Sequence, residues 1–437
     1  MADTPHRVII IGGGFAGIRA AQNLHYVPVE ITLIDKRNFH LFQPLLYQVA
    51  TGGLSPANIA APLRAVVRKQ RNCKVVLGEV TGFDLPNKQV LMGEERLPFD
   101  SLIVAAGAGN FYFGHPEWEK HAPGLKSIEE ATEIRARVLS AFEAAEHTPD
   151  PTHRDRLMTM VVVGGGPTGV EMVGSISELA RHTLRNNFRT IDPAVTRIIL
   201  IEGHDRVLPP FPEKLSAKAL IVLRRMGVEV RTSSHVKDIQ ADHVMVERAG
   251  QIERIDTSTV IWAAGVRASP LGKLIADATG TTIDRGGRVV VGKDLSIPNH
   301  PHLFVVGDMA AATYPDGKPL PGVAPVAMQA GKYVANVIRH RVAGKPFTDP
   351  FHYWDKGNMA TIGRNAAVVD IYFFRFSGWF AWMTWLFVHL MYLVAFQNRL
   401  LVLLQWFWNY VTRNRAARLI TGEKGRFESL KMPVKPG

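Results

Sequence analysis

Short apolar runs that end in glycine-rich turns recur along the chain. The runs over residues 7–11 and 160–163 each lead into such a turn, and helix-forming residues follow. A continuous apolar run of this length is typical of a parallel strand that is covered on both faces. The pattern therefore predicts two strand–loop–helix units. Further apolar runs, over 30–34 and 197–201, predict a second strand in each unit.

The two turns share one glycine spacing. Both fit G-x-G-x-x-G, through Gly12, Gly14 and Gly17 in the first turn and through Gly164, Gly166 and Gly169 in the second. The first glycine of such a loop permits the turn, the second lets the backbone approach a pyrophosphate, and the third lets the helix pack on the strand. The two loops therefore predict that the chain binds two dinucleotides.

An acidic residue ends the second strand of each unit, Asp35 in the first and Glu202 in the second. A carboxylate at this place accepts hydrogen bonds from a ribose and repels a 2′-phosphate. Glu202 therefore favours NADH over NADPH, although Arg206 nearby leaves NADPH open.

Three later apolar runs also close on turns that contain glycine, where a backbone can meet a cofactor. They cover Phe99 to Gly109, Ile261 to Val266, and "HLFVVGDMAAA", which contains Gly307 and Asp308. In this order the segments resemble the two-dinucleotide-binding flavoproteins of glutathione-reductase-like fold. The resemblance implies an α/β fold with two Rossmann-like domains, FAD on the first loop, NAD(P)H on the second, and Asp308 at the ribityl chain.

The same resemblance implies that the NAD domain is inserted within the FAD domain. We expect the FAD-binding domain over 1–115 and 276–348, the NADH-binding domain over 116–275, and a C-terminal helical membrane anchor with a basic tail over 349–437.

The single cysteine, Cys73, restricts which electron acceptors the flavin can have. Disulfide reductases and sulfide:quinone oxidoreductases need at least two cysteines beside the flavin. What remains resembles the type II NADH dehydrogenases, through "NFHLFQPLLYQVATGGL", "GGGPTGVEMVGSISELA", "GVAPVAMQAGKYVANVI", "DKGNMATIGRNAAV" and the apolar tail. The resemblance implies that NADH is oxidised by a membrane quinone through non-covalently bound FAD, without proton pumping. A membrane-associated NADH-binding flavoprotein that acts as a redox sensor or scaffold is the alternative.

Three residues are predicted to be catalytic. Glu171 lies early in the second glycine-loop helix, and the resemblance places it near nicotinamide and flavin, where it orders the site or relays protons; a plain helix-start acid is the alternative. Gln329 is placed to hydrogen-bond a quinone carbonyl, although Pro325 replaces a glutamine that the family's A-Q-x-A-x-Q motif often has. Lys356 resembles the family lysine near flavin and quinone, and a solvated surface lysine is equally open.

The predicted cofactor-binding residues come from the two loops, the strand-end acids and the later turns. They are Gly12, Gly14, Phe15, Ala16, Gly17, Asp35, Lys36, Val80, Ala106, Gly107, Gly164, Gly166, Gly169, Glu202, Gly265, Gly307, Asp308, Ala324 and Val326.

The tail differs from the rest of the chain. Five of the eight tryptophans lie within 373–437. The same segment holds nine Lys and Arg against two Glu, which accounts for +7 of the formal net charge of +12. The apolar segment 376–396 is long enough to span a bilayer as one helix. The next, 399–413, has polar residues on one side and apolar residues on the other, which is typical of a helix that lies in a membrane surface.

We therefore expect a homodimer on the cytoplasmic face of the cell membrane, peripheral or monotopic, with a lipid-free dimer interface at the tail as the alternative. The concentration of positive charge beside the apolar tail argues against nucleic acid as its partner. The histidines show no ligand spacing, so we expect no metal. The start of the sequence shows no signal peptide, and the lone cysteine fits a reducing compartment.

Overall fold

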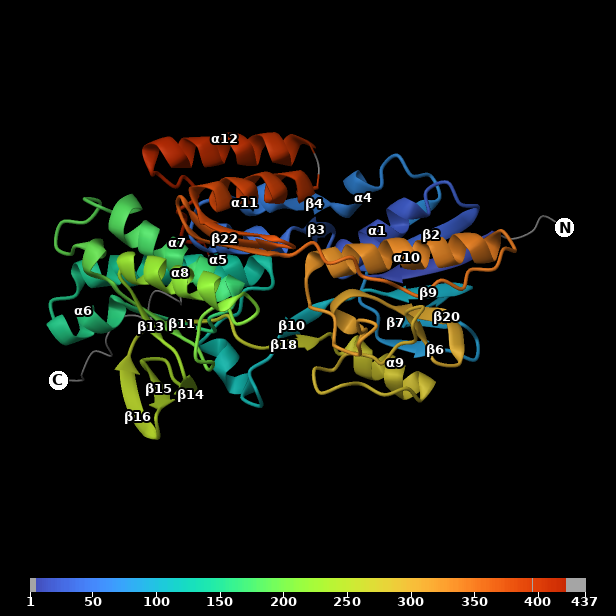
Figure 1. Cartoon of the computed structure of the whole chain (residues 1–437), viewed down its shortest axis with the longest axis horizontal. Helices are drawn as coiled ribbons and strands as arrows, with labels where there is room; N and C mark the ends of the chain where they lie inside the picture. Colours follow the sequence, from blue (N-terminus) through green and yellow to red (C-terminus); the bar gives the residue numbers. More distant parts are fainter. Residues whose placement is uncertain (1–4, 395, 422–437) are drawn as a thin grey trace. The chain divides into compact units, whose positions relative to one another are not determined.

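The computed structural model describes residues 5–394 and 396–421 (Figure 1). The chain divides into two compact units, each made of three segments. Unit 1 consists of Met1–Leu41, Ala60–Gly109 and Val266–Lys356, and unit 2 of Phe42–Ile59, Asn110–Gly265 and Gly357–Gly437.

The centre of unit 1 is a six-stranded sheet of order β19-β20-β9-β1-β2-β5. All neighbouring strands run parallel except β19 and β20. The strands are β1 (His6–Ile11), β2 (Val29–Asp35), β5 (Cys73–Leu77), β9 (Ser101–Val104), β19 (Ser296–Ile297) and β20 (His300–Val305).

Both faces of this sheet are covered, which explains the continuous apolar run of β1. Ile10 belongs to the core under α1 (Phe15–Asn23) and α10 (Ala324–Val342), whereas Ile9 and Ile11 belong to a second core on the opposite face. In Figure 1, α1 and α10 lie side by side on this sheet. A Cβ at Gly331 would lie 2.2 Å from the Ala16 carbonyl oxygen, so glycine lets α10 pack directly against α1.

Smaller elements complete unit 1. They are β3 (Phe39–Leu41), β4 (Ala60–Pro62), α4 (Leu63–Val66), the three-stranded sheet β6 (Gly82–Asp84), β7 (Gln89–Met92) and β8 (Glu95–Pro98), then β10 (Ala108–Asn110), which continues into unit 2, β18 (Val266–Ala268), α9 (Leu271–Thr279) and the turn η5 (Gly307–Met309).

Unit 2 contains a parallel sheet of order β13-β12-β11-β17. Its strands are β11 (Thr159–Val163), β12 (Arg197–Ile201), β13 (Val228–Arg231) and β17 (Thr259–Trp262). The helices of this part are α5 (Ile128–His147), α6 (Pro151–Leu157), α7 (Pro167–Glu178) and α8 (Glu213–Arg225), and an antiparallel meander consists of β14 (Ser234–Ile239), β15 (His243–Arg248) and β16 (Gln251–Asp256).

Short elements and the C-terminal part complete unit 2. The short ones are η1 (Gln43–Leu45), α2 (Leu46–Ala50), α3 (Pro56–Ile59), η2 (Pro116–Lys120), η3 (Leu179–Thr183) and η4 (Pro193–Val195). The C-terminal part is an antiparallel sheet of β21 (Asn358–Gly363), β22 (Ala366–Ile371) and β23 (Phe374–Gly378), followed by α11 (Trp379–Tyr392) and α12 (Phe396–Thr412).

The sheet β21–β23 is not foreseen by the sequence, and the apolar segment 376–396, which is long enough to span a bilayer as one helix, does not form a single helix. Residues up to Gly378 finish β23, where Gly378 adopts a φ of +88°, and α11 ends at Tyr392. With 14 residues, α11 is about 21 Å long. Among the described residues, the structure contains no helix long and apolar enough to cross a membrane.

Candidate functional site

The first glycine loop in unit 1 has the geometry of a dinucleotide cradle. Gly12 has a φ of +104°, and a Cβ there would lie 2.4 Å from the Ala105 carbonyl oxygen; a Cβ at Gly17 would lie 1.8 Å from the carbonyl oxygen of Gly12. Gly14 differs, because a Cβ there would meet nothing within 4 Å. The turn and the helix packing therefore need Gly12 and Gly17, while Gly14 leaves the loop open toward a ligand.

Asp35 braces this loop from the end of β2. Its Oδ2 accepts the Gly13 N–H at 2.6 Å, and its Oδ1 accepts the Arg37 N–H at 2.7 Å. On the other side, the ring Nδ1 of buried His40 lies 3.0 Å from the Gly13 carbonyl oxygen. The helix that follows begins at Gly14 without a side-chain cap within the described chain, which leaves its first N–H groups for a phosphate. These residues fit the pyrophosphate and ribose of FAD.

The other residues of unit 1 that are predicted to contact FAD differ in burial and in location. Val80 is buried and Lys36 is exposed, while Phe15 packs edge-on against His40. Gly107 has a φ of +68°, and Gly307, with a φ of +69°, lies beneath Ala16 and Ala327. Ala106 follows the end of β9, and Asp308 lies in η5. Ala324 and Val326 lie in the first turn of α10. Their contact with FAD stays a prediction.

The second glycine loop in unit 2 repeats the geometry of the first. Gly164 has a φ of +109°, and a Cβ at Gly169 would lie 1.8 Å from the Gly164 carbonyl oxygen. A Cβ at Gly166 would meet nothing within 4 Å. Pro167 opens α7, where a missing N–H costs nothing. The loop therefore has the geometry of a second dinucleotide cradle, with the same open side.

Glu202 holds the second loop as Asp35 holds the first. The side chain is 7% exposed and accepts the Gly165 N–H through Oε2. Its Oε1 accepts the His204 N–H at 2.7 Å and lies 2.6 Å from the ring Nδ1 of His204. His204 is a neighbour that sequence reasoning missed, because a histidine two residues after a strand carries no signal of its own.

In the described part of the chain, no hydrogen bond joins Arg206 to Glu202. Its guanidinium binds the Glu213 carboxylate at 3.2 Å and the Pro209 carbonyl oxygen at 3.1 Å. This cation is therefore engaged at the start of α8, which supports NADH over NADPH.

Glu171 stands in the second turn of α7, inside unit 2. Part of the side chain stays accessible, but dense protein around the carboxyl group desolvates it and raises its pKa to about 8. The Thr361 N–H of β21 donates to Oε1 at 3.4 Å, a long bond that lowers the pKa only in part. Glu171 is therefore largely protonated at neutral pH, which suits a residue that gives and takes a proton.

Gln329 and Lys356 lie in unit 1, and both are connected to Trp354. The Gln329 amide donates to the Trp354 carbonyl oxygen and accepts the Trp354 N–H, each at 2.9 Å. The Lys356 ammonium stands 5.9 Å from the centre of the Trp354 ring. Gln329 thus fixes the segment that carries Lys356, a role that the sequence did not predict. Its predicted bond to a quinone remains a prediction.

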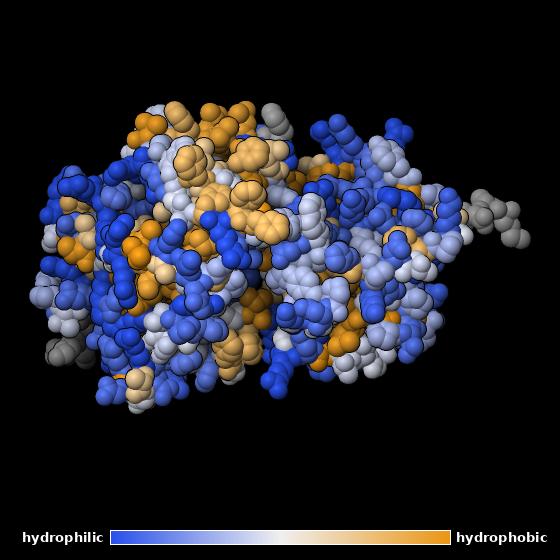
Figure 2. Space-filling view, in the orientation of Figure 1, coloured by the Kyte–Doolittle hydropathy of each residue, from blue (hydrophilic) through white to orange (hydrophobic). Residues whose placement is uncertain are grey.

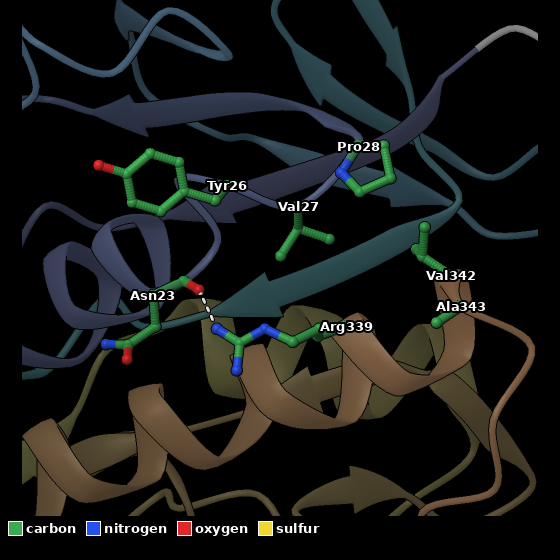
Figure 3. A pocket seen from close by; sticks show the side chains of 7 residues that line it. All are labelled: Asn23, Tyr26, Val27, Pro28, Arg339, Val342 and Ala343. Carbon is green, nitrogen blue, oxygen red and sulfur yellow. Dashed lines mark hydrogen bonds between the residues drawn. The ribbon is translucent and has the colours of Figure 1, made fainter.

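Figure 3 shows a hollow of about 300 Å³ in unit 1, and none of the residues that line it belongs to the first glycine loop. It is lined by residues at the C-terminal ends of α1 and α10 and by the segment 26–28 before β2, and Arg339 there donates to the Asn23 carbonyl oxygen. Ligands of such folds bind at the carboxyl ends of the strands, whereas this hollow lies where β2 begins. Across the described residues, no group of three or more His, Cys, Asp or Glu is placed to hold a metal ion.

Comparison with known proteins decides the family. A model of the pyridine nucleotide-disulphide oxidoreductase family matches residues 6–331, and a model of the NDH2 C-terminal domain matches 355–414. The type II NADH:quinone oxidoreductase Ndh of Mycobacterium tuberculosis is 47% identical over 426 residues, covering 96% of this chain and 91% of the relative. NdhA of the same organism is 48% identical over 427 residues, covering 96% and 90%. The chain belongs to the type II NADH:quinone oxidoreductases.

Solved structures agree on the fold. NDH2 of Plasmodium falciparum in complex with RYL-552 superposes with a TM-score of 0.85 at 19% identity, covering 96% of this chain and all of that one. The sulfide:quinone oxidoreductase of Aquifex aeolicus superposes with a TM-score of 0.71 at 18% identity, covering 94% and 92%. The predicted family and the two Rossmann-like units are confirmed.

The bracing of the second loop by Glu202 generates a prediction about the nucleotide. Glu202→Gln should narrow the preference for NADH over NADPH by about tenfold, because the repulsion of a 2′-phosphate is lost. The ratio of kcat/KM for the two donors measures this. Glu253→Gln, at an exposed acid on β16, is the control and should leave the ratio unchanged. Equal kcat/KM for both donors in the parent protein would contradict the assignment.

Proposed function

We propose that this chain oxidises NADH with a membrane quinone, through FAD bound at the loop of unit 1. The observation that carries the proposal is the pair of matching cradles, each open at its middle glycine and each braced by a strand-end acid. Bound FAD supplies the two-electron chemistry that links a hydride donor to a quinone. The chain has a single cysteine, so an intrachain cysteine pair cannot take the place of the quinone as acceptor.

Within this proposal, the residues of the chain hold, orient and transfer protons. The loops of Gly12 and Gly164 hold the two pyrophosphates on helix N-termini, where the helix dipoles favour negative charge. Glu171, protonated at neutral pH, exchanges a proton beside the nucleotide. Gln329 keeps the segment from Trp354 to Lys356 in place, and the Lys356 ammonium favours negative charge that develops on a quinone.

The proposed membrane surface is the outer side of the two C-terminal helices. Figure 2 shows apolar side chains gathered over α11 and α12. The exposed ones are Trp379, Phe380, Met383, Phe387, Met391, Leu400, Leu401, Leu403, Leu404, Phe407, Trp408 and Val411. A contiguous exposed apolar surface of this kind is typical of a site that contacts a membrane or another protein.

The polarity of α12 is the reverse of that of an ordinary surface helix. Two of its polar groups point to the protein: Asn409 donates to the Gly53 carbonyl oxygen at 3.0 Å, and Trp406 donates to the Gln48 side chain at 2.7 Å. Most of its large apolar side chains point outward, with Phe407 65% exposed, whereas Val402 is buried. A helix of this kind buries its outer face in a lipid surface.

Basic residues flank that face. Arg399 and Arg413 stand near the two ends of α12, and the basic residues from Lys424 onward lie outside the described part of the chain. Anionic headgroups attract such flanks. The homodimer and the cytoplasmic side of the membrane remain predictions from the family resemblance.

The site assignment is tested by separating the two half-reactions under anaerobic stopped flow. Glu171→Ala should slow the bleaching of the flavin by NADH about a hundredfold, the size typical of a lost proton-transfer group. Gln329→Ala should spare bleaching and slow reoxidation by quinone about tenfold, because the Lys356 segment loses its fixed position.

Two exposed residues serve as controls, Glu143→Ala on α5 and Lys332→Ala on α10. Both should match the parent protein. Normal half-reactions in both test variants would overturn the site assignment, and a parent protein that bleaches with NADH but fails to pass electrons to quinone would favour a redox sensor.

The membrane surface is tested by Leu404→Glu combined with Phe407→Glu. Partition onto vesicles that contain anionic lipid should fall a hundredfold or more, because the double variant no longer inserts two apolar side chains into the lipid. Ile252→Glu, at a position 62% exposed on β16, should leave partition unchanged. Unchanged partition of the double variant, or a change only in its oligomeric mass, would contradict lipid docking in favour of a protein interface.

A further inference from the structure

Helix α11 has an inner side as well as the apolar outer side. Phe380 and Phe387 are 73% and 65% exposed, whereas Trp385 is 1% exposed. Ala381, one turn before Trp385, is also buried. The helix that presents part of the proposed membrane surface therefore sends one indole ring into unit 2.

Aromatic rings on three sides fix the orientation of Trp385. The His389 ring stacks on it with ring centres 4.0 Å apart, and the rings of Tyr47 and Trp406 stand 6.3 Å and 6.0 Å away. Rings packed in this way have little freedom to turn, so the direction of the indole N–H is largely set by the fold.

The indole N–H of Trp385 is buried and has no hydrogen-bond partner among the described residues. Buried donors are seldom left unpaired, because the lost hydrogen bond to water is not replaced. The ring nevertheless lies close enough to the Glu171 carboxyl to lower its pKa, against the larger opposite effect of burial. The indole N–H of Trp385 therefore lies beside the Glu171 carboxyl group without forming an ordinary hydrogen bond to it.

The other polar groups around this place are already engaged. The Tyr47 hydroxyl on α2 accepts the Gln48 amide at 2.8 Å, and the Tyr47 pKa is raised by burial and by Glu171. His389 on α11 pairs its Nδ1 with the Trp385 carbonyl oxygen, and burial lowers its pKa to about 4, so it is neutral at pH 7. Glu178 on α7 binds Arg415 at 3.0 Å.

We propose that Trp385 is a positioning residue for Glu171, whose indole N–H becomes the hydrogen-bond donor of the carboxylate when Glu171 loses its proton. As the pH is raised, the proton passes from a carboxyl oxygen of Glu171 to water, and the carboxylate gains the N–H···O bond, while Trp385 keeps its own proton. The long bond from the Thr361 N–H is the second donor. This inference rests on the proposed role of Glu171.

The test is the ionisation of Glu171 in the FAD-loaded enzyme, followed by infrared difference spectroscopy as the pH is raised. The band of the protonated carboxyl group is assigned by its absence in Glu171→Gln. Trp385→Phe keeps an aromatic ring and removes the N–H, and it should raise the pKa of Glu171 by about one unit, because a donor to the charged form is lost. Trp382→Phe, which removes an indole N–H from the same helix, is the matched control and should leave the pKa unchanged.

A second variant tests the same hydrogen bond in case phenylalanine at position 385 disturbs the fold. Replacement of Trp385 by 3-benzothienylalanine preserves the ring shape and exchanges N–H for sulfur, and it should give the same upward shift. Flavin absorbance and the melting temperature check that each variant keeps FAD and its fold. The pH profile of flavin bleaching by NADH should move in the same direction, and that shift should vanish when Glu171→Gln is added.

The possible failures are distinct. If Glu171→Gln removes the carboxyl band and slows bleaching, but neither Trp385 replacement moves the pKa more than Trp382→Phe does, the role of Trp385 is wrong and that of Glu171 stands. If Glu171→Gln leaves both half-reactions at the parent rate, the proposed role of Glu171 fails, and the inference about Trp385 fails with it.

Discussion

The structure of unit 2 depends on one close backbone approach between the nucleotide-binding helix and the C-terminal sheet. A Cβ at Gly174 of α7 would lie 1.7 Å from the Ile362 carbonyl oxygen of β21, so the two backbones touch where a side chain would otherwise separate them. This contact brings Thr361 to Glu171, three residues earlier on the same helix. It also allows α11, which follows the same small sheet, to contribute Trp385 next to that carboxyl group.

The far end of α7 is tied to the tail by charge. Glu178 accepts the backbone N–H of Arg364 and the guanidinium of Arg415. Arg415 also donates to the Thr51 carbonyl oxygen and to the Ser175 hydroxyl, and the Ala417 N–H donates to the Gly52 carbonyl oxygen. Residues after α12 therefore return to the helix that carries the second cradle. In this fold the residues that follow α12 are part of the structure that surrounds α7 and its glycine loop.

Local spacing in the sequence was enough to predict the two cradles. The pairing of Gly13 with Asp35 and of Gly165 with Glu202 follows from parallel strands that place a loop beside the next strand end. The residues around Glu171 are different, because Tyr47, Thr361 and Trp385 are far apart in the chain and no periodicity relates them.

The structure of the tail could be predicted only in part, for a similar reason. An apolar segment shows that burial or lipid contact is needed, but it does not reveal that Gly378, with a positive φ, separates a strand from a helix. The sequence also did not predict which side of α12 faces the protein, because polar residues ordinarily face water. Here Asn409 meets a backbone carbonyl from another segment, and only the tertiary structure reveals that partner.

The central claim is that burial within unit 2 desolvates Glu171 and keeps it protonated at neutral pH. The most direct measurement is the free energy of unfolding of the parent protein minus that of Glu171→Gln, across pH. The folded pKa, about 8, lies above the unfolded value of 4.5, so the folded state binds more protons between them. We expect the parent protein to lose stability relative to the variant as pH rises from about 4.5 to 8, and the difference to level off above that. A difference that stays flat across this range, or that grows in favour of the parent protein, would contradict the claim.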